Sequence, residues 1–144
     1  MKTKGFTLVE LLVVIAILAI LATVSVVGYT SFIENAEKSA AETEAHQIET
    51  YVNAVLMADD ACQIGTGVWA VRTADGIKLY TTENGTTAVA ENTKVELITD
   101  LAGLENGDVY VISGKLVYVY DLGSDSAVGG TDKAADKTVA IDLK

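Results

Sequence analysis

The 144-residue chain has no proline, one cysteine, one histidine and only ten basic residues. A single cysteine excludes an intrachain disulfide, so the chain must fold without a covalent cross-link. The net charge of −10 repels nucleic-acid phosphates, and because no cluster of Lys and Arg offsets it, we expect no nucleic-acid partner. The single histidine, His46, sits on or beside the polar face of a predicted helix, where a lone histidine is a surface residue far more often than a ligand or a base.

What the chain does have is one long hydrophobic run near its start. Phe6 to Val27 consists almost entirely of Leu, Val, Ile and Ala. As a helix this run spans about 33 Å, enough to cross the hydrocarbon core of a bilayer. Lys2 and Lys4 precede the run, so the positive-inside rule places the N-terminus in the cytoplasm and the rest of the chain outside.

Glu10 is the residue that a simple membrane span does not explain. A secretory signal cut near Ala22 fits poorly, because the run is long and no A-x-A site closes it. An uncleaved anchor fits the length but not the carboxylate, which costs about 2.5–3.5 kcal/mol near a helix centre and less towards an end. Cleavage after Gly5 would instead leave Phe6 as the N-terminus. Glu10 would then lie one turn from a new amino group, near the positive end of the helix dipole.

The stretch from Lys4 to Glu10, KGFTLVE, resembles the processing site of type IV prepilins and pseudopilins. It joins a short basic leader, a Gly–Phe junction, a glutamate and an uninterrupted apolar helix, and with that helix covers roughly the first third of the chain. The resemblance implies that a prepilin peptidase in the membrane cuts between Gly5 and Phe6 and N-methylates Phe6. It also implies that Glu10 pairs with the terminal amine of a neighbouring subunit.

Two positions depart from the pattern of that family. Ala19 stands where the family often has a glycine, and Val27, followed by Gly28, stands where it often has a proline. A mid-helix glycine costs roughly 1 kcal/mol relative to alanine, whereas proline costs about 3 kcal/mol. Whether this helix unwinds near Gly28 on assembly therefore stays open.

Beyond Gly28 the apolar residues keep a helical spacing to about Ala58, with glutamates on the other side. This amphipathic segment is most simply a continuation of the membrane helix, with its apolar stripe laid on a folded domain. Cys62 is interpreted as a small, partly buried residue at the end of this helix.

From Gly67 the alternation of apolar residues changes to a period of two, which predicts strands. Val68–Thr73 pairs with Ile77–Thr82, and Val109–Ile112 with Lys115–Tyr120, each across a glycine-containing turn. Further strands are expected at Thr86–Ala90, after an Asn84-Gly85 turn, and at Thr138–Leu143. Val95–Leu104 is ambiguous and suits a short helix. The order predicts an α+β fold, with a long N-terminal helix packed on a C-terminal antiparallel sheet.

The sequence contains no catalytic motif, such as a glycine-rich phosphate loop or a metal-spaced set of His and Cys, so we expect neither an enzyme nor a cofactor. Pseudopilins can bind calcium in a C-terminal loop, which makes Asp121 and Asp125, with Asp132, candidate ligands. Their spacing is not that of an EF-hand, and ordinary turn chemistry explains them equally well. Asn84-Gly85-Thr86 fits a glycosylation sequon, but an Asn-Gly turn is the simpler explanation.

The chain is therefore divided into a leader (1–5), a transmembrane and filament-core helix (6–28), an amphipathic helix (29–62) and an antiparallel sheet domain (63–144). The resemblance implies a pilin that waits in the cytoplasmic membrane and is processed by prepilin peptidase. Pilus assembly machinery then polymerises it into a homo-oligomeric helical filament on the cell surface, for adhesion, motility or biofilm formation. The alternatives are a pseudopilin of a type II secretion or competence system, and a membrane-anchored extracellular binding domain that never polymerises.

Overall fold

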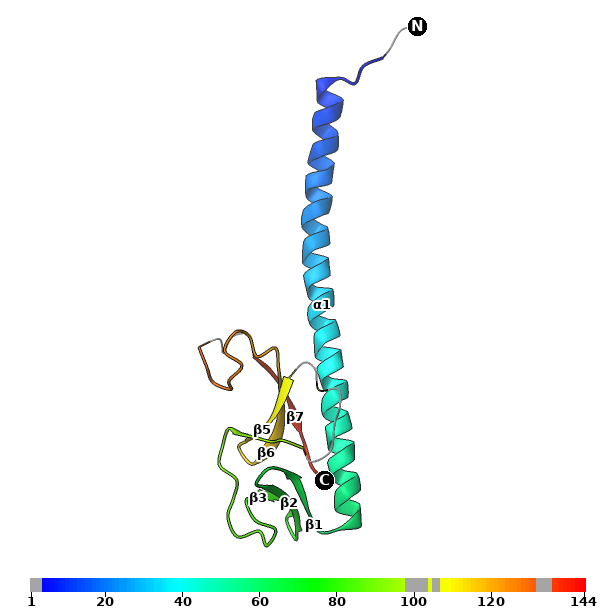
Figure 1. Cartoon of the computed structure of the whole chain (residues 1–144). Coiled ribbons are helices and arrows are strands. Elements are labelled where there is room, and N and C mark those ends of the chain that lie inside the picture. The colour runs from blue at the N-terminus through cyan, green and yellow to red at the C-terminus, as the bar shows by residue number, and fades with distance from the viewer. Residues whose placement is uncertain (1–3, 98–103, 105–106, 132–135) are drawn as a thin grey trace. The chain divides into compact units, whose positions relative to one another are not determined.

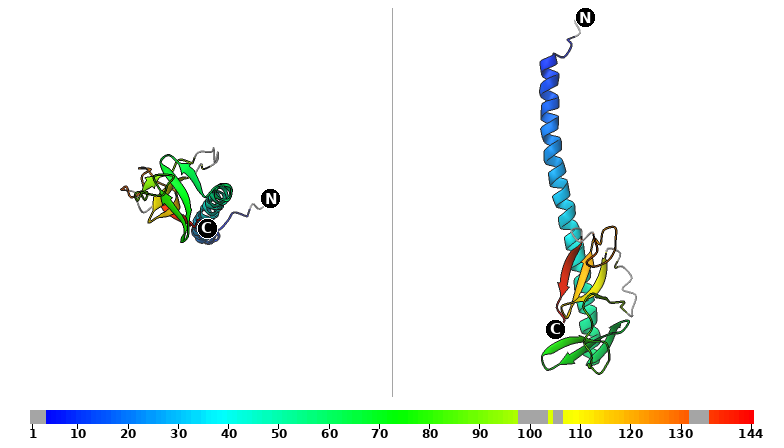
Figure 2. Two further views of the ribbon diagram at one scale, coloured as in Figure 1. Left: turned by 90° about the horizontal axis from the view of Figure 1, so that it is seen from below. Right: turned by 90° about the vertical axis from the view of Figure 1, so that its left-hand side faces the viewer.

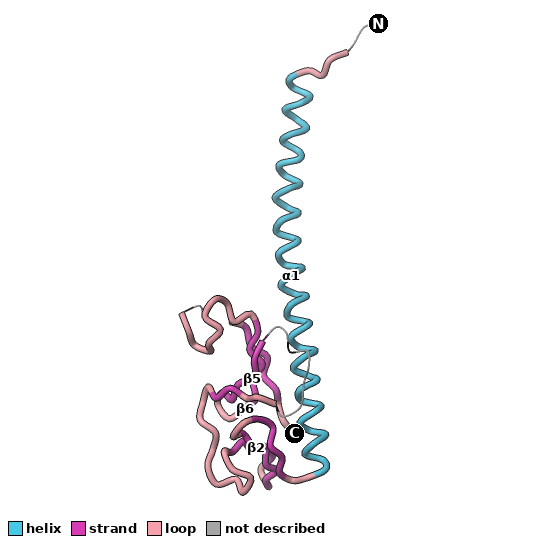
Figure 3. Tube along the Cα trace, in the orientation of Figure 1, coloured by secondary structure: helices cyan, strands magenta, loops and turns pink. Residues whose placement is uncertain are grey.

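The computed structural model describes residues 4–97, 104, 107–131 and 136–144. In this part of the chain a long helix precedes every strand, as Figures 1 and 3 show. The elements are α1 (Leu8–Ala58), β1 (Ala61–Gly65), β2 (Val68–Thr73), β3 (Gly76–Tyr80), β4 (Thr93–Lys94), β5 (Gly107–Ile112), β6 (Lys115–Tyr120) and β7 (Lys137–Ile141). The predicted α+β fold is confirmed. The chain divides into two compact units, residues 1–39 and 40–144, and α1 contributes to both.

In the first unit, residues 8–27 of α1 are apolar on all sides apart from Glu10, Thr23 and Ser25. The large apolar side chains of the helix in this unit are all exposed, with exposed fractions from 37% at Ile33 to 81% at Leu8. By length and composition α1 is able to cross a membrane. A helix that is hydrophobic all round needs an apolar environment, so these side chains require lipid or other helices around them.

The helix is continuous across Gly28, and the hydroxyl groups near that residue are bonded within it. Thr23 and Ser25 each donate to a backbone carbonyl one turn earlier, both at 2.7 Å, and Thr30 does so at 3.0 Å. These bonds satisfy polar groups that would otherwise be costly in an apolar environment. Unwinding near Gly28 on assembly stays an open prediction.

In the second unit, α1 presents one buried stripe to the strands, and its end at Ala58 agrees with the predicted end. The stripe recurs every three or four residues and consists of Ala41, Ala45, Ile48, Val52 and Leu56. Figure 2 shows the strands gathered on one side of this part of the helix. The stripe joins residues from both sheets in one hydrophobic core.

The strands form two antiparallel sheets instead of the single sheet that was predicted. Their orders are β1-β2-β3 and β4-β5-β6-β7. In Figures 1 and 2 the first sheet lies beside the C-terminal end of α1, and the second lies farther back along the helix. Both predicted hairpins are present, with β2 paired to β3 and β5 paired to β6.

Cys62 lies in a strand, which corrects its predicted place at the end of the helix. The helix ends at Ala58, and β1 places Cys62 opposite Ala70 of β2. The thiol is free and buried, and burial raises its pKa. The periodicity of α1 does not predict this strand, because the extended conformation of β1 depends on its pairing with β2.

Other boundaries also differ from the predictions. β3 ends at Tyr80 instead of Thr82, and β5 begins at Gly107 instead of Val109. The Asn84-Gly85 turn is present, with Gly85 at a φ of 64°, but Thr86–Ala90 forms only an isolated bridge, Ala88 with Tyr80. The last strand is Lys137–Ile141, shifted by one or two residues. The start of the expected helix at Val95–Leu104 is not helical, and residues 98–103 of it lie outside the described residues.

A buried polar contact ties β6 to α1. The Tyr118 side chain is fully buried, its hydroxyl donates to the Glu44 carboxylate, and its ring stacks on Tyr120 with centroids 6.3 Å apart. Burial, and then the hydrogen bond to Glu44, raise the pKa of Tyr118 well above its usual value. The fold therefore favours the protonated phenol at this position.

The raised pKa of Tyr118 predicts a loss of stability in strong alkali. The protonated phenol contributes fully to the free energy of unfolding below about pH 10, where Tyr118 of the unfolded chain is also protonated. This contribution is lost as the pH rises above that value. Tyr118→Phe should lower the free energy of unfolding by about 1–3 kcal/mol at pH 7. Above about pH 10 the free energy of unfolding of this variant should decline less steeply with pH than that of the wild type. Denaturant unfolding of both proteins across this range measures the effect, and parallel declines would contradict it.

Candidate processing and assembly site

The predicted cleavage site lies in the non-helical segment before α1. Gly5 and Phe6 are both exposed, and 89% of the Phe6 surface is accessible. A Cβ atom placed on Gly5 would meet no other atom within 4 Å. The Gly5–Phe6 peptide bond is therefore open to a protease, since exposed segments outside secondary structure are the preferred sites of cleavage.

Thr7 and Glu10 form a reciprocal hydrogen-bonded cap at the start of α1. The backbone N–H of Thr7 donates to Glu10 Oε2 at 2.9 Å, and the backbone N–H of Glu10 donates to Thr7 Oγ1 at 3.3 Å. This arrangement is a capping box, in which a Thr at the N-cap and a Glu three residues later satisfy each other's amides. Glu10 therefore has a second function besides the one that the resemblance implies.

Thr7 is a residue that the sequence reasoning missed, although a signal for it was present. Thr7-Leu8-Val9-Glu10 fits the [S/T]-x-x-E pattern that precedes an apolar helix. The cap fixes the carboxylate of Glu10 beside the residue that follows Phe6. Cleavage after Gly5 would thus create an ammonium group next to a residue that already bonds Glu10.

The cap can be tested with Thr7→Val, which keeps the shape of the side chain but removes its acceptor oxygen. Amide hydrogen exchange at residues 8–10, measured by NMR in detergent micelles, should become about 2- to 30-fold faster because the first turn frays. The matched control is Thr23→Val, which removes a hydroxyl bonded in mid-helix and should leave residues 8–10 unchanged. Equal exchange in Thr7→Val and wild type would contradict the cap.

The calcium candidates lie in and beside the loop that follows β6. The carboxylate of Asp125 accepts the N–H of Ala127 and the hydroxyl of Thr131, each at 3.3 Å, and Asp121 has a positive φ of 56°. Within the described ranges no group of three or more His, Cys, Asp or Glu side chains gathers, and Asp132 falls outside them. Both aspartates act in the loop's own turns, and calcium binding stays a prediction.

His46 lies on the exposed face of α1, as predicted. Its Nδ1 atom is 3.0 Å from Glu49 Oε2, one turn later on the same helix. This is an ordinary surface contact between residues three positions apart.

Comparison with known families identifies the N-terminal segment. The family model described as "Prokaryotic N-terminal methylation motif" matches residues 1–26. No solved structure matches the chain at a significant level. The matched residues include Gly5, Phe6 and Glu10, and they end before Gly28. Residues 1–26 thus carry the N-terminal methylation motif, which is the class III signal peptide of type IV pilins and pseudopilins.

Proposed function

We propose that this chain is a structural subunit that polymerises through residues 6–28 into a type IV pilus filament. The observation that carries the proposal is the exposure of every large apolar side chain along the first unit of α1, a segment that largely coincides with the methylation motif at residues 1–26. A membrane anchor alone needs the apolar surface but not the processing site. A filament subunit needs both.

Processing is the first step. The prepilin peptidase cuts the open Gly5–Phe6 bond and methylates the new amino group of Phe6. Before this cleavage the prepilin lies in the cytoplasmic membrane, with Lys2 and Lys4 on the cytoplasmic side and the sheet domain outside. The capping box keeps the Glu10 carboxylate next to the new N-terminus.

Assembly moves residues 6–28 from lipid into a bundle of helices from other subunits. Because lipid tails are as apolar as the helix, this transfer gains little hydrophobic energy, and close packing and polar contacts must supply specificity. A charge in an apolar bundle must be paired, and the pair proposed here joins Glu10 of one subunit to the Phe6 amine of the next. The assembly machinery supplies the remaining energy.

The sheet domain faces outward in the filament and carries the surface for adhesion. Its core is closed by the stripe of α1 and does not depend on the exposed apolar residues of the first unit. The domain therefore keeps its own fold while the N-terminal helix changes surroundings from lipid to protein.

Immunogold electron microscopy of producing cells, with an antibody against the sheet domain, tests the proposal. We expect labelled filaments that extend from the cell surface. Label confined to the membrane would contradict polymerisation and favour the anchored binding domain. The methylation motif is shared with pseudopilins, and for a pseudopilin of a secretion or competence system the label would stay on short structures that do not leave the envelope.

A further inference from the structure

Two aromatic side chains lie just beyond the apolar run of α1. Tyr29 and Phe32 are 67% and 69% exposed, and their spacing of three residues places them on the same side of the helix. The next charged residues along the chain are Glu34 and Glu37, which follow Phe32 within about one and a half helical turns. The helix thus changes from fully apolar to acidic through an aromatic pair.

The distance along the helix places this pair one bilayer thickness from its start. From Leu8 to Tyr29 the helix rises by about 32 Å, and the hydrocarbon core of a bilayer is about 30 Å thick. When Leu8 lies at the cytoplasmic boundary of the core, Tyr29 and Phe32 therefore lie at the outer boundary. Glu10 is then within about 3 Å of the cytoplasmic boundary.

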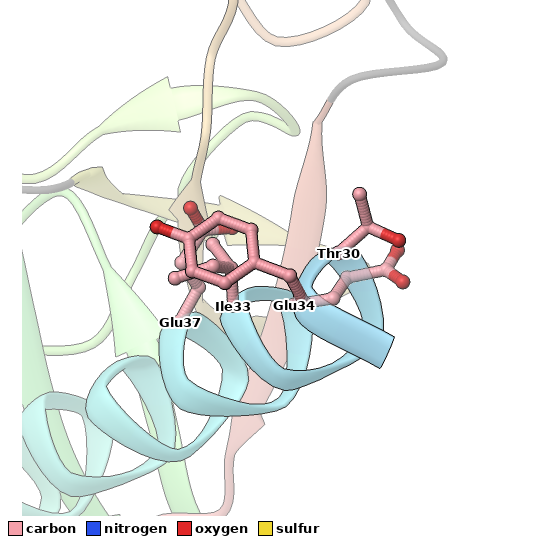
Figure 4. Close-up of a pocket in the computed structure, with 5 residues that line it drawn as sticks. Thr30, Ile33, Glu34 and Glu37 are labelled. Carbon is pink, nitrogen blue, oxygen red and sulfur yellow. The ribbon is translucent and has the colours of Figure 1, made fainter. Parts of the chain in front are cut away.

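The local surface has the mixed character of a lipid–water boundary. Tyr29, Thr30, Ile33, Glu34 and Glu37 line a shallow groove along the helix. Figure 4 shows Ile33 between the carboxylates of Glu34 and Glu37, with Thr30 on the preceding turn. Apolar and acidic groups thus meet within two turns. Aromatic rings are enriched at this level of membranes because they are apolar in body and, in tyrosine, polar at the tip.

We propose that Tyr29 and Phe32 form an aromatic anchor that holds the outer end of the apolar run of α1 at the headgroup level of a lipid bilayer. By fixing the depth of the helix, the anchor also keeps Glu10 near the cytoplasmic boundary, where a carboxylate costs less than at the centre. The proposal rests on the membrane stage of the proposed function. It does not depend on polymerisation.

Depth-dependent fluorescence quenching of the full chain in phosphatidylcholine vesicles tests the anchor. Trp69 is replaced by phenylalanine so that a single tryptophan, introduced by Phe32→Trp, reports its own depth. The vesicles contain lipid brominated either near the headgroup end or near the terminal end of the acyl chain, and iodide serves as the aqueous quencher. For Phe32→Trp we expect stronger quenching by the shallow bromines than by the deep ones, with partial quenching by iodide.

Two matched variants calibrate the depths. Ile17→Trp, in mid-run, should be quenched most by the deep bromines, and Glu37→Trp should be quenched by iodide and not by lipid. Phe32→Trp behaving like Glu37→Trp or like Ile17→Trp would overturn the anchor and leave the membrane stage intact. Absence of lipid quenching in Ile17→Trp would overturn the membrane stage and the anchor together.

A second measurement covers the case in which Trp69→Phe impairs folding, as judged by far-UV circular dichroism. Nitroxide labels on Phe32→Cys, Ile17→Cys and Glu37→Cys report the same depths through their relaxation by oxygen and by a water-soluble nickel chelate. Cys62 is buried. Wild-type protein treated with the nitroxide reagent serves as the control for background labelling of Cys62. The anchor predicts an intermediate ratio of the two relaxation rates for Phe32→Cys, and a ratio equal to that of either control would overturn it.

Discussion

Cells that produce the Glu10→Ala variant are expected to make few or no filaments, although the protein accumulates in the membrane. In the proposed assembly every subunit contact buries one terminal amine of Phe6 in an apolar bundle. Removal of the carboxylate leaves that ammonium group without its partner, and an unpaired buried charge is strongly unfavourable. The same defect recurs at every subunit along the filament, so the expected effect is much larger than that of a single lost contact.

The control for this experiment is Glu37→Ala on the same helix. Glu37 lies beyond the apolar run and lines the exposed groove of Figure 4. Its removal changes the net charge by the same amount as Glu10→Ala but should leave filaments in place. Electron microscopy counts filaments per cell, and immunoblotting of membranes shows that each variant is present. Filament numbers equal to wild type in Glu10→Ala would mean that Glu10 is not the assembly contact.

Ile48→Ala is expected to remove a large part of the stability of the sheet domain. Ile48 has no exposed surface and lies at the middle of the buried stripe of α1. Truncation of a buried isoleucine to alanine costs about 2–5 kcal/mol, because a cavity replaces the lost contacts. Whole domains are stable by only about 5–15 kcal/mol. Urea unfolding of the full chain in detergent, followed by Trp69 fluorescence, measures the loss.

Met57→Ala is the matched control for Ile48→Ala. Met57 is on the last turn of the same helix, but 86% of its surface is exposed. Its truncation should change the free energy of unfolding by no more than about 0.5 kcal/mol. Similar losses in the two variants would contradict the placement of the core against the stripe.

The helix and the two hairpins could be predicted because their signals are local. The apolar spacing up to Leu56 marks both the buried stripe and the end of α1 near Ala58. Glycines at positive φ in the turns, Gly76 and Gly114, pin the pairing of the neighbouring strands. The processing site was equally visible, since its residues are contiguous from Lys4 to Glu10.

Features that depend on distant pairing could not be predicted. The two-residue β4 exists only through its pairing with β5. β1 is next to its partner β2 in the chain, but it has no clear alternation of its own and is defined by that pairing. The contact of Tyr118 with Glu44 joins residues 74 positions apart. Such pairings depend on side-chain packing across the fold more than on intrinsic preference. The capping role of Thr7, by contrast, was present in the sequence as a local pattern.

Mass analysis of the N-terminus of the mature protein tests directly whether the chain is processed as a prepilin. Protein purified from producing cells is expected to begin at Phe6 and to carry one methyl group on its terminal nitrogen. The open Gly5–Phe6 bond and the methylation motif at residues 1–26 support this result. An intact N-terminus at Met1, or a terminus after Ala22, would contradict it.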